Sequence, residues 1–191
     1  WSARNYIIVN GQKNLFNIAV EGASQNNLYT QVSVIDDFSK FRKTLEMAYR
    51  KAPCFIDAMN VLEKVFCFED RRFNHFIKNS FSVILEYVGI TTELMFSSDL
   101  SNKKELKGKD KILDICKLLG ANEYLNAIGG QELYNRQEFE DNCIKLGFVE
   151  PILEPYPQFS KDFIPGLSII DVLMMNPLTV IKRLITSYNI V

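Results

Sequence analysis

The chain has 191 residues, 47% of them hydrophobic and 24% charged, which is ordinary for a globular protein with one sizeable core. Its net charge of −1 gives no electrostatic argument for a nucleic-acid partner. No apolar run approaches the ~20 residues of a membrane span, because Asp171 interrupts the longest one, at residues 167–175. The composition therefore favours a single domain that neither spans a membrane nor binds nucleic acid.

The cysteines and the histidine limit the chemistry that this chain can perform. Cys54, Cys67, Cys116 and Cys143 show no CxxC spacing, so we expect buried, reduced thiols, as in a cytoplasmic protein. His75 is the only histidine, which excludes a histidine-rich metal site, and we predict no metal. The sequence identifies no cofactor and leaves the oligomeric state open.

Residues 1–35 form a β-rich beginning of the domain. Two runs of strand-forming residues, 6–9 and 15–20, flank Asn10-Gly11, and both of these residues tolerate positive φ. This pattern predicts a β-hairpin. A loop that extends to Asn14 is an alternative, and it leaves the turn type open.

Residues 36–89 predict a helical insertion. Apolar residues recur at helical spacing in three segments, 39–50, 55–68 and 70–88. Pro53 separates the first two segments, and Gly89 is the expected left-handed end of the third. We expect these helices to pack on the sheet.

Residues 90–191 alternate between strand and helix signals. Short apolar strands are expected at 94–96, 123–128 and 148–153, with helices at 110–119 and from Asn135 to a stop at Gly147. Two more helices follow, one beginning at Ser168 and one running from Pro177 to about Tyr188. The pattern predicts an α/β fold with a mostly parallel sheet, built from Rossmann-like crossover units.

Two of the expected strand ends carry small and polar residues, and ligands of open parallel sheets bind at such ends. Ser97, Ser98 and Asp99 follow the first strand as candidate catalytic residues, unless they serve only as turn formers. Gly129 and Gly130 follow the second strand, where they either let the backbone approach a ligand or form a tight turn.

Further polar residues accompany these strand ends. We expect polar side chains near the same strand ends from Gln131, Tyr134 and Asn135, although Asn135 is also a candidate helix cap. Ser168 and Asp171 can bind substrate or can start a helix. The residues alone do not choose between these functions.

Several segments together resemble a known family. They are Trp1, Arg4, Asn5 and Ile7 at the start, then residues 49–53 with Phe55, and residues 89–91, 97–100, 108–130, 156–158 and 163–171. With these segments in order along nearly the whole chain, the sequence resembles the WbqC-like protein family of bacterial polysaccharide gene clusters. Other members carry a histidine where this chain has Phe41, which argues against an obligatory histidine catalyst, and we expect a further segment to precede Trp1.

The resemblance implies a cytoplasmic transferase of cell-surface polysaccharide (O-antigen, lipopolysaccharide) biosynthesis, with glycine transfer to a small-molecule or carrier-linked sugar. In that reading Asp99 orients or deprotonates the acceptor, and backbone N–H groups at Gly129 and Gly130 stabilise an oxyanion. Tyr134, Tyr156 and Phe159 offer surfaces for a sugar or nucleotide ring. The family motifs add a set of substrate-binding candidates: Arg4, Asn5, Gln158, Ser168 and Asp171.

Two alternatives remain. One is a nucleotide-binding transferase that activates its substrate, since strand-end sites suit phosphates. The other is a non-catalytic binding or scaffold protein of the same pathway, consistent with the lack of a recognised catalytic motif in the sequence.

Overall fold

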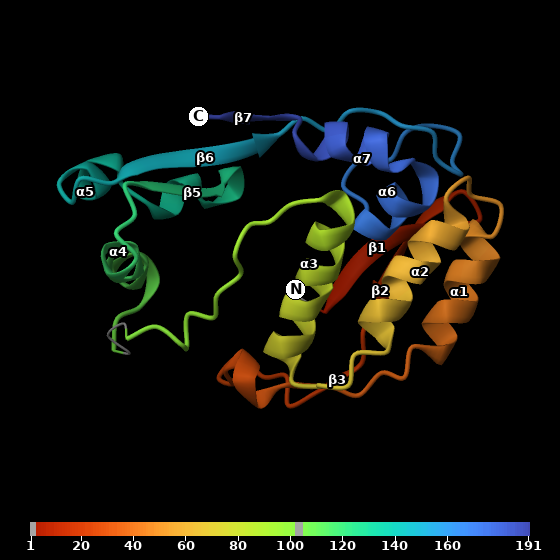
Figure 1. Ribbon diagram of the computed structural model, residues 1–191, viewed down its shortest axis with the longest axis horizontal. Coiled ribbons are helices and arrows are strands. Elements are labelled where there is room, and N and C mark those ends of the chain that lie inside the picture. The colour runs from red at the N-terminus through yellow and green to blue at the C-terminus, as the bar shows by residue number, and fades with distance from the viewer. Residues whose placement is uncertain (1–2, 102–104) are drawn as a thin grey trace. The chain divides into compact units, whose positions relative to one another are not determined.

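The computed structural model describes residues 3–101 and 105–191, so Trp1 of the family motif lies outside the described residues. The chain divides into two compact units, which can be followed in Figure 1. Unit 1 comprises Trp1–Thr92 and Leu153–Ile185, and unit 2 comprises Glu93–Ile152 and Thr186–Val191. No helix in the described part of the chain is long and apolar enough to cross a membrane. That the two units fold as the single domain expected from the chain length stays a prediction.

Unit 1 begins with the predicted hairpin, formed by β1 (Arg4–Val9) and β2 (Gln12–Asn17). The strands pair antiparallel, and Val9 lies opposite Gln12, so only Asn10 and Gly11 form the turn. Both turn residues have positive φ, 52° and 76°, which matches the twist that a two-residue hairpin requires. The hairpin is confirmed, and its loop is the shorter of the two alternatives.

The three predicted helices of this unit are confirmed as α1 (Ser39–Tyr49), α2 (Phe55–Phe66) and α3 (Phe73–Val88). Gly89 ends α3 with φ of 77°. Between the hairpin and α1 lies a small two-stranded sheet with a 3₁₀ turn (Tyr29–Gln31), its strands being β3 (Val20–Glu21) and β4 (Ser33–Val34). Two C-terminal helices complete the unit, α6 (Ile169–Met175) and α7 (Leu178–Ile185).

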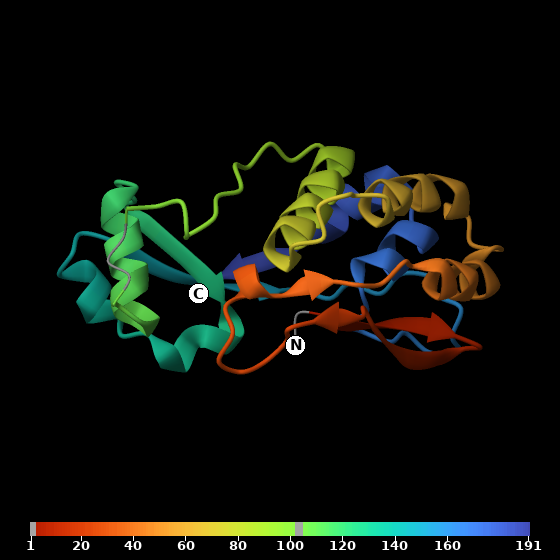
Figure 2. The ribbon, with the colours of Figure 1, turned by 90° about the horizontal axis from the view of Figure 1, so that it is seen from below.

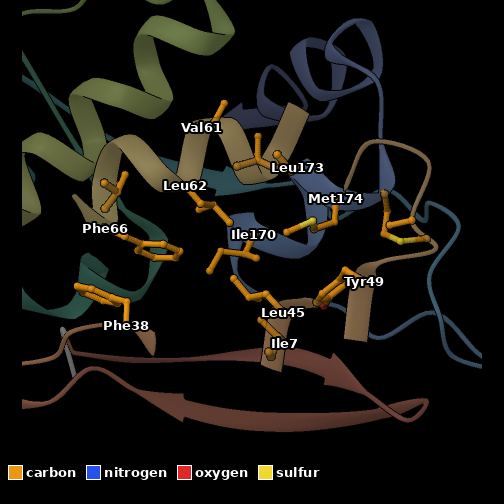
Figure 3. Close-up of a cluster of buried hydrophobic side chains, with 14 of the residues drawn as sticks. Ile7, Phe38, Leu45, Tyr49, Val61, Leu62, Phe66, Ile170, Leu173 and Met174 are labelled. Atoms are coloured by element: carbon orange, nitrogen blue, oxygen red, sulfur yellow. The ribbon is translucent and has the colours of Figure 1, made fainter. Parts of the chain in front are cut away.

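The core of unit 1 lies between the hairpin and the helices. Figure 2 shows β1 and β2 on one side, with α1, α2 and α6 facing them. Ile7 from β1 and Leu45 from α1 meet Leu62 and Leu173 from α2 and α6, all of them buried, as Figure 3 shows. Burying each such side chain contributes roughly 1.5–3 kcal/mol. The helices that were expected to form an insertion are therefore the main body of this core.

Unit 2 is built around a three-stranded sheet in the order β5-β6-β7. Its strands are β5 (Glu123–Ala127), β6 (Lys145–Pro151) and β7 (Tyr188–Ile190), and its helices are α4 (Gly108–Leu118) and α5 (Arg136–Glu140). Phe139 of α5 and Phe148 of β6 are almost completely buried in a separate small core.

The expectation of a mostly parallel sheet is corrected by the strand pairing. Only β5 and β6 pair in parallel, whereas β6 and β7 are antiparallel. The helix–strand alternation is present, so the α/β class holds, but residues 91–96 form no strand. Leu94–Phe96 offers only three apolar residues, and Met95 is 44% exposed. A run this short gains too little burial to compensate for ordering its backbone.

The boundary between α5 and β6 also differs from the prediction. Gly147 was expected to end the helix, but it lies inside β6, where a Cβ atom would approach Leu125 Cδ2 of β5 to 2.8 Å. The turn after α5 is made by Cys143, which has φ of 59°. Cys143 is exposed, and so is Cys67, so burial is confirmed for Cys116 but is wrong for these two thiols.

Candidate functional site

The first candidate site is a half-open apolar pocket of about 190 Å³ in unit 1. Its floor is made by aromatic side chains that come from β2, from α1 to α3 and from the residue before α1: Phe16, Phe38, Phe41, Phe66 and Phe76. Its polar lining residues include Arg4, Asn5, Ser80 and Ser168. Three of these, Arg4, Asn5 and Ser168, are predicted substrate-binding residues, and the structure brings them together.

A second pocket, of about 390 Å³, adjoins the first, because both are lined by Ala3, Arg4 and Ile18. The second pocket adds the polar residues Asn17, Ser24 and Gln25. We call the two pockets together the groove. Arg4, on its shared wall, is exposed, and its guanidinium has no ion-pair partner within residues 3–101 and 105–191. Among the described residues, Arg4 is therefore an unpaired cation at the place where the two pockets meet.

Phe38 is the most unusual residue of the groove. It is almost completely buried but has φ of 59°, a left-handed conformation that is rare for a bulky side chain. The carboxylate of Asp36 holds it there, accepting from Phe38 N at 2.8 Å and from Ala19 N at 3.1 Å. Strained positions of this kind are frequent at ligand sites, where the surrounding structure holds them in place.

The strained backbone places the Phe38 ring between two others. Its centroid is 4.8 Å from that of Phe66 and 5.5 Å from that of Phe76, and both pairs are stacked (Figure 3 shows Phe38 and Phe66). The Arg42 guanidinium lies 5.2 Å from the Phe66 ring, and the Arg71 guanidinium lies 5.7 Å from the Phe38 ring. These cation–π contacts hold the aromatic floor in a fixed arrangement.

The side chains of four residues form a buried polar cluster: Asp171, Tyr49, Tyr156 and Gln158. Asp171, at its centre, has no exposed surface. Its carboxylate accepts hydrogen bonds from Tyr49 Oη at 2.6 Å, from Tyr156 Oη at 2.8 Å and, more weakly, from Gln158 Nε2 at 3.4 Å. Tyr49 Oη in turn accepts from Ile8 N of β1 at 2.9 Å. The cluster thus ties α6, α1, β1 and the loop before α6 together.

The environment of the cluster shifts its acid–base properties. Burial raises the pKa of Asp171 above 3.8, although the hydrogen bonds from Tyr49, Tyr156 and Gln158 oppose this shift. Burial also raises the pKa of Tyr49 and of Tyr156, and the adjacent carboxylate raises both further. Both hydroxyl groups therefore remain protonated and donate to Asp171.

Ser168 connects the cluster to the groove. Its hydroxyl caps α6 by accepting from Ile170 N, and its backbone N–H donates to Tyr6 O of β1 at 2.8 Å. The predicted helix-starting role of Ser168 is therefore confirmed, and the residue also lines the apolar pocket. Its hydroxyl contacts no carboxylate or histidine among the described residues, so it has no base beside it to make it a nucleophile.

Phe159, another predicted site residue, lies in unit 1, and the remaining ones lie in unit 2. Ser97 and Ser98 form an exposed turn, and Asp99 follows with its Oδ1 3.3 Å from Ser98 Oγ. Because residues 91–96 are not a strand, this turn does not stand at a strand end. A catalytic role for Asp99 with Ser97 and Ser98 stays a prediction.

The segment after β5 is a 3₁₀ helix, Ile128–Leu133, which contains Gly129, Gly130 and Gln131. At Gly130 a Cβ atom would come within 2.8 Å of Asn126 Nδ2, a local reason for glycine there. The Tyr134 ring packs 5.8 Å from Phe139 in the small core, and Asn135 Oδ1 caps α5 by accepting from Gln137 N at 2.9 Å. The capping alternative for Asn135 is therefore confirmed, and substrate binding by this segment stays a prediction.

Sequence reasoning missed Phe38, Ser80 and the role of Tyr49. The signal for Tyr49 was present, because it opens one of the family-like segments. Phe38 carried no such signal, since a phenylalanine in the left-handed region is not expected from its type. Among the described residues no group of three or more His, Cys, Asp or Glu side chains is placed to hold a metal ion.

Comparison with known families adds one result. The sequence matches the WbqC-like protein family over residues 1–182, which includes the whole groove and the buried cluster. Neither the curated proteins nor the solved structures yielded a match. The chain therefore belongs to the WbqC-like protein family.

Proposed function

We propose that this protein is a cytoplasmic transferase of bacterial cell-surface polysaccharide biosynthesis and that the groove of unit 1 binds its nucleotide- or carrier-linked sugar. Membership of the WbqC-like family supports the pathway. The observation that carries the binding proposal is the position of Arg4, a cation without an ion-pair partner among the described residues, on the wall that the two pockets share.

Each compartment suits one part of such a ligand. The aromatic floor offers flat apolar surface for a ring or an acyl chain. Arg4 offers a planar donor fork that matches a phosphate or carboxylate, and Asn17, Ser24 and Gln25 offer hydrogen-bonding groups for sugar hydroxyls. The pocket volumes, about 190 and 390 Å³, together fall in the range of roughly 300–1,000 Å³ that small-molecule sites occupy.

The type of transfer is the finer part of the proposal. Glycine transfer to the sugar, the reaction that the family context suggests, needs an activated acyl donor and a base near the acceptor. Neither Ser80 nor Ser168 has a base beside it among the described residues, which favours direct attack by the acceptor over an acyl-enzyme on these serines. A non-catalytic sugar-binding protein would use the same groove.

Isothermal titration with uridine diphosphate sugars, uridine diphosphate and the free sugars tests the binding. Charge-assisted hydrogen bonds contribute about 1.5–3 kcal/mol, so Arg4→Ala should weaken binding of the diphosphates by at least about tenfold. Arg4→Lys keeps the positive charge but loses the planar pair of donors, so its affinity should lie between those of the wild type and Arg4→Ala. Lys43→Ala, an exposed cation of α1 that lies outside the groove, is the matched control and should leave the affinity unchanged.

Two outcomes would count against the proposal. One is that no ligand of the panel binds, and the other is that Arg4→Ala binds as tightly as the wild type. A transferase and a binding protein are then separated by incubating the wild type with a glycyl donor and the bound sugar, and by following the sugar for the mass of a glycyl group. An unchanged mass over prolonged incubation would favour the binding protein.

A further inference from the structure

Another hollow, of about 240 Å³, lies at the C-terminal end of α1, still within unit 1. It is lined by Met47, Ala48, Arg50, Lys51 and Phe159. Phe41, which lines the groove, precedes Arg50 by nine positions on or just after the same helix. At a rise of 1.5 Å per residue their Cα atoms are about 13 Å apart along the axis. The hollow is therefore separate from the groove.

The charge of this hollow is unbalanced. Arg50 and Lys51 are both exposed, and neither has an ion-pair partner within the part of the chain that the structure describes. Among the residues that the structure describes, no carboxylate lines the hollow. The end of a helix carries roughly −0.5 elementary charge, which makes cations favourable there, but two formal positive charges exceed it. A net positive, concave surface remains.

The backbone that carries these cations is fixed. Arg50 N donates to Glu46 O at 3.0 Å and Ala52 N donates to Tyr49 O at 2.7 Å. Cys54 N then donates to Met174 O of α6 at 3.0 Å, which holds the turn against the core. The fold thus fixes the backbone from which the two cationic side chains extend.

The aromatic wall is fixed as well. Phe159 is 36% exposed, and its ring centroid lies 6.3 Å from that of Tyr49. The preceding residue, Gln158, accepts from Ile164 N at 2.8 Å and donates to Asp171, so the loop that presents Phe159 is anchored to the buried cluster. A rigid aromatic face beside two cations is a combination that binds a ring next to a phosphate.

We propose that the hollow formed by Arg50, Lys51 and Phe159 binds a diphosphate group, with the cations on the phosphates and the attached ring or apolar chain against Phe159. The diphosphate is borne by a nucleotide or by a lipid, and the charged chemistry is the same for both. The inference does not rest on the function proposed above, since Arg4 and the groove take no part in it.

Titration with inorganic pyrophosphate at low ionic strength tests the cations. Arg50→Ala and Lys51→Ala should each weaken binding by about tenfold, as expected for loss of a charge-assisted hydrogen bond. Lys43→Ala, a cation of the same helix outside the hollow, should change the affinity less than twofold. Uridine diphosphate, titrated in the Arg4→Ala background to remove the groove, should bind several-fold more weakly to Phe159→Leu, whereas pyrophosphate should not.

Flotation with phosphatidylcholine vesicles, with and without diacylglycerol pyrophosphate, separates the two sources of the diphosphate. Flotation that needs the diphosphate lipid and is lost in Arg50→Ala assigns the hollow to a lipid-borne group. Binding of soluble pyrophosphate without flotation assigns it to a nucleotide. If pyrophosphate does not bind at millimolar concentration and the vesicles do not float the protein, or if binding is unchanged when Arg50 and Lys51 are both replaced, the proposal is overturned.

Discussion

Replacement of Asp171 probes the buried cluster most directly. The carboxylate is fully buried and is the acceptor for the hydroxyl groups of Tyr49 and Tyr156. In Asp171→Ala both hydroxyl groups lose that acceptor. In Asp171→Asn one side-chain oxygen remains, and the amide group can donate to the other hydroxyl oxygen.

The size of the effect follows from the burial of each hydroxyl group. A buried donor left without an acceptor costs about 1–3 kcal/mol. Tyr49 is fully buried, so the whole penalty applies to it, whereas Tyr156 is partly buried and water can replace part of its hydrogen bond. We therefore expect Asp171→Ala to lower the free energy of unfolding by roughly 2–4 kcal/mol and Asp171→Asn by about 1 kcal/mol.

The raised pKa of Asp171 also predicts in which direction its contribution to stability changes with pH. Because burial raises the pKa of Asp171 above 3.8, the native state binds more protons than the unfolded state once the pH passes that value. The contribution of Asp171 is therefore fully present below pH 3.8 and declines as the pH rises through the raised pKa. The stability advantage of the wild type over Asp171→Asn should be larger at pH 4 than at pH 7.

Urea denaturation followed by circular dichroism, between pH 4 and pH 8, measures both quantities. The reasoning would be refuted if Asp171→Ala unfolds within 0.5 kcal/mol of the wild type. It would be refuted equally if the advantage over Asp171→Asn grows with pH, because that is the behaviour of a carboxylate whose pKa is lowered by folding. Tyr156→Phe removes one donor only and serves as the control, with an expected loss of about 1 kcal/mol.

Two further predictions concern left-handed residues. Phe38→Ala should lower the free energy of unfolding by about 3–5 kcal/mol through lost packing. Phe38→Gly should lower it by no more, because glycine adopts φ of 59° without the ~1–2 kcal/mol of strain that other residues have there. If urea denaturation shows the glycine variant to be clearly less stable than the alanine variant, the strain is absent. Gly11→Ala should lower the free energy of unfolding by about 1–2 kcal/mol, because alanine is strained at positive φ, and Gly11→Asn should lower it by less. A steric clash does not contribute, since the nearest atom to a Cβ at this position, Phe159 O, is 3.5 Å away. Equal losses for the two variants in thermal melts would argue against backbone strain as the cause.

The sequence predicted correctly those turns, caps and helices that depend on residues near one another in the chain. Asn10-Gly11 forms its turn because both residues tolerate positive φ, and Ser168 caps its helix with its own hydroxyl. Helical spacing located α1 to α3 because each presents an apolar face to the core. These elements needed no knowledge of the rest of the chain.

The parallel sheet was overpredicted because strand pairing is not local. Leu94–Phe96 has an apolar strand-like composition but forms no strand. Gly147, which looks like a helix stop, belongs to β6, where it pairs with Leu125 of β5, whose side chain occupies the space that a Cβ atom would need. The groove shows the same division. Arg4, Asn5 and Ser168 were predictable from the family resemblance, but the aromatic floor required knowing how three helices pack against the hairpin.

The buried carboxylate of Asp171 connects one interior residue to the walls of two separate surface hollows. Asp171 holds Tyr49, which immediately precedes Arg50, and it holds Gln158, which immediately precedes Phe159. It also lies three positions after Ser168, which lines the groove. A leucine at this position would fill the space but could not accept these hydrogen bonds. The two segments that carry Arg50 and Phe159 would then lose their common anchor. An acidic residue in the core therefore fits a role in positioning the walls of both sites better than a role in catalysis.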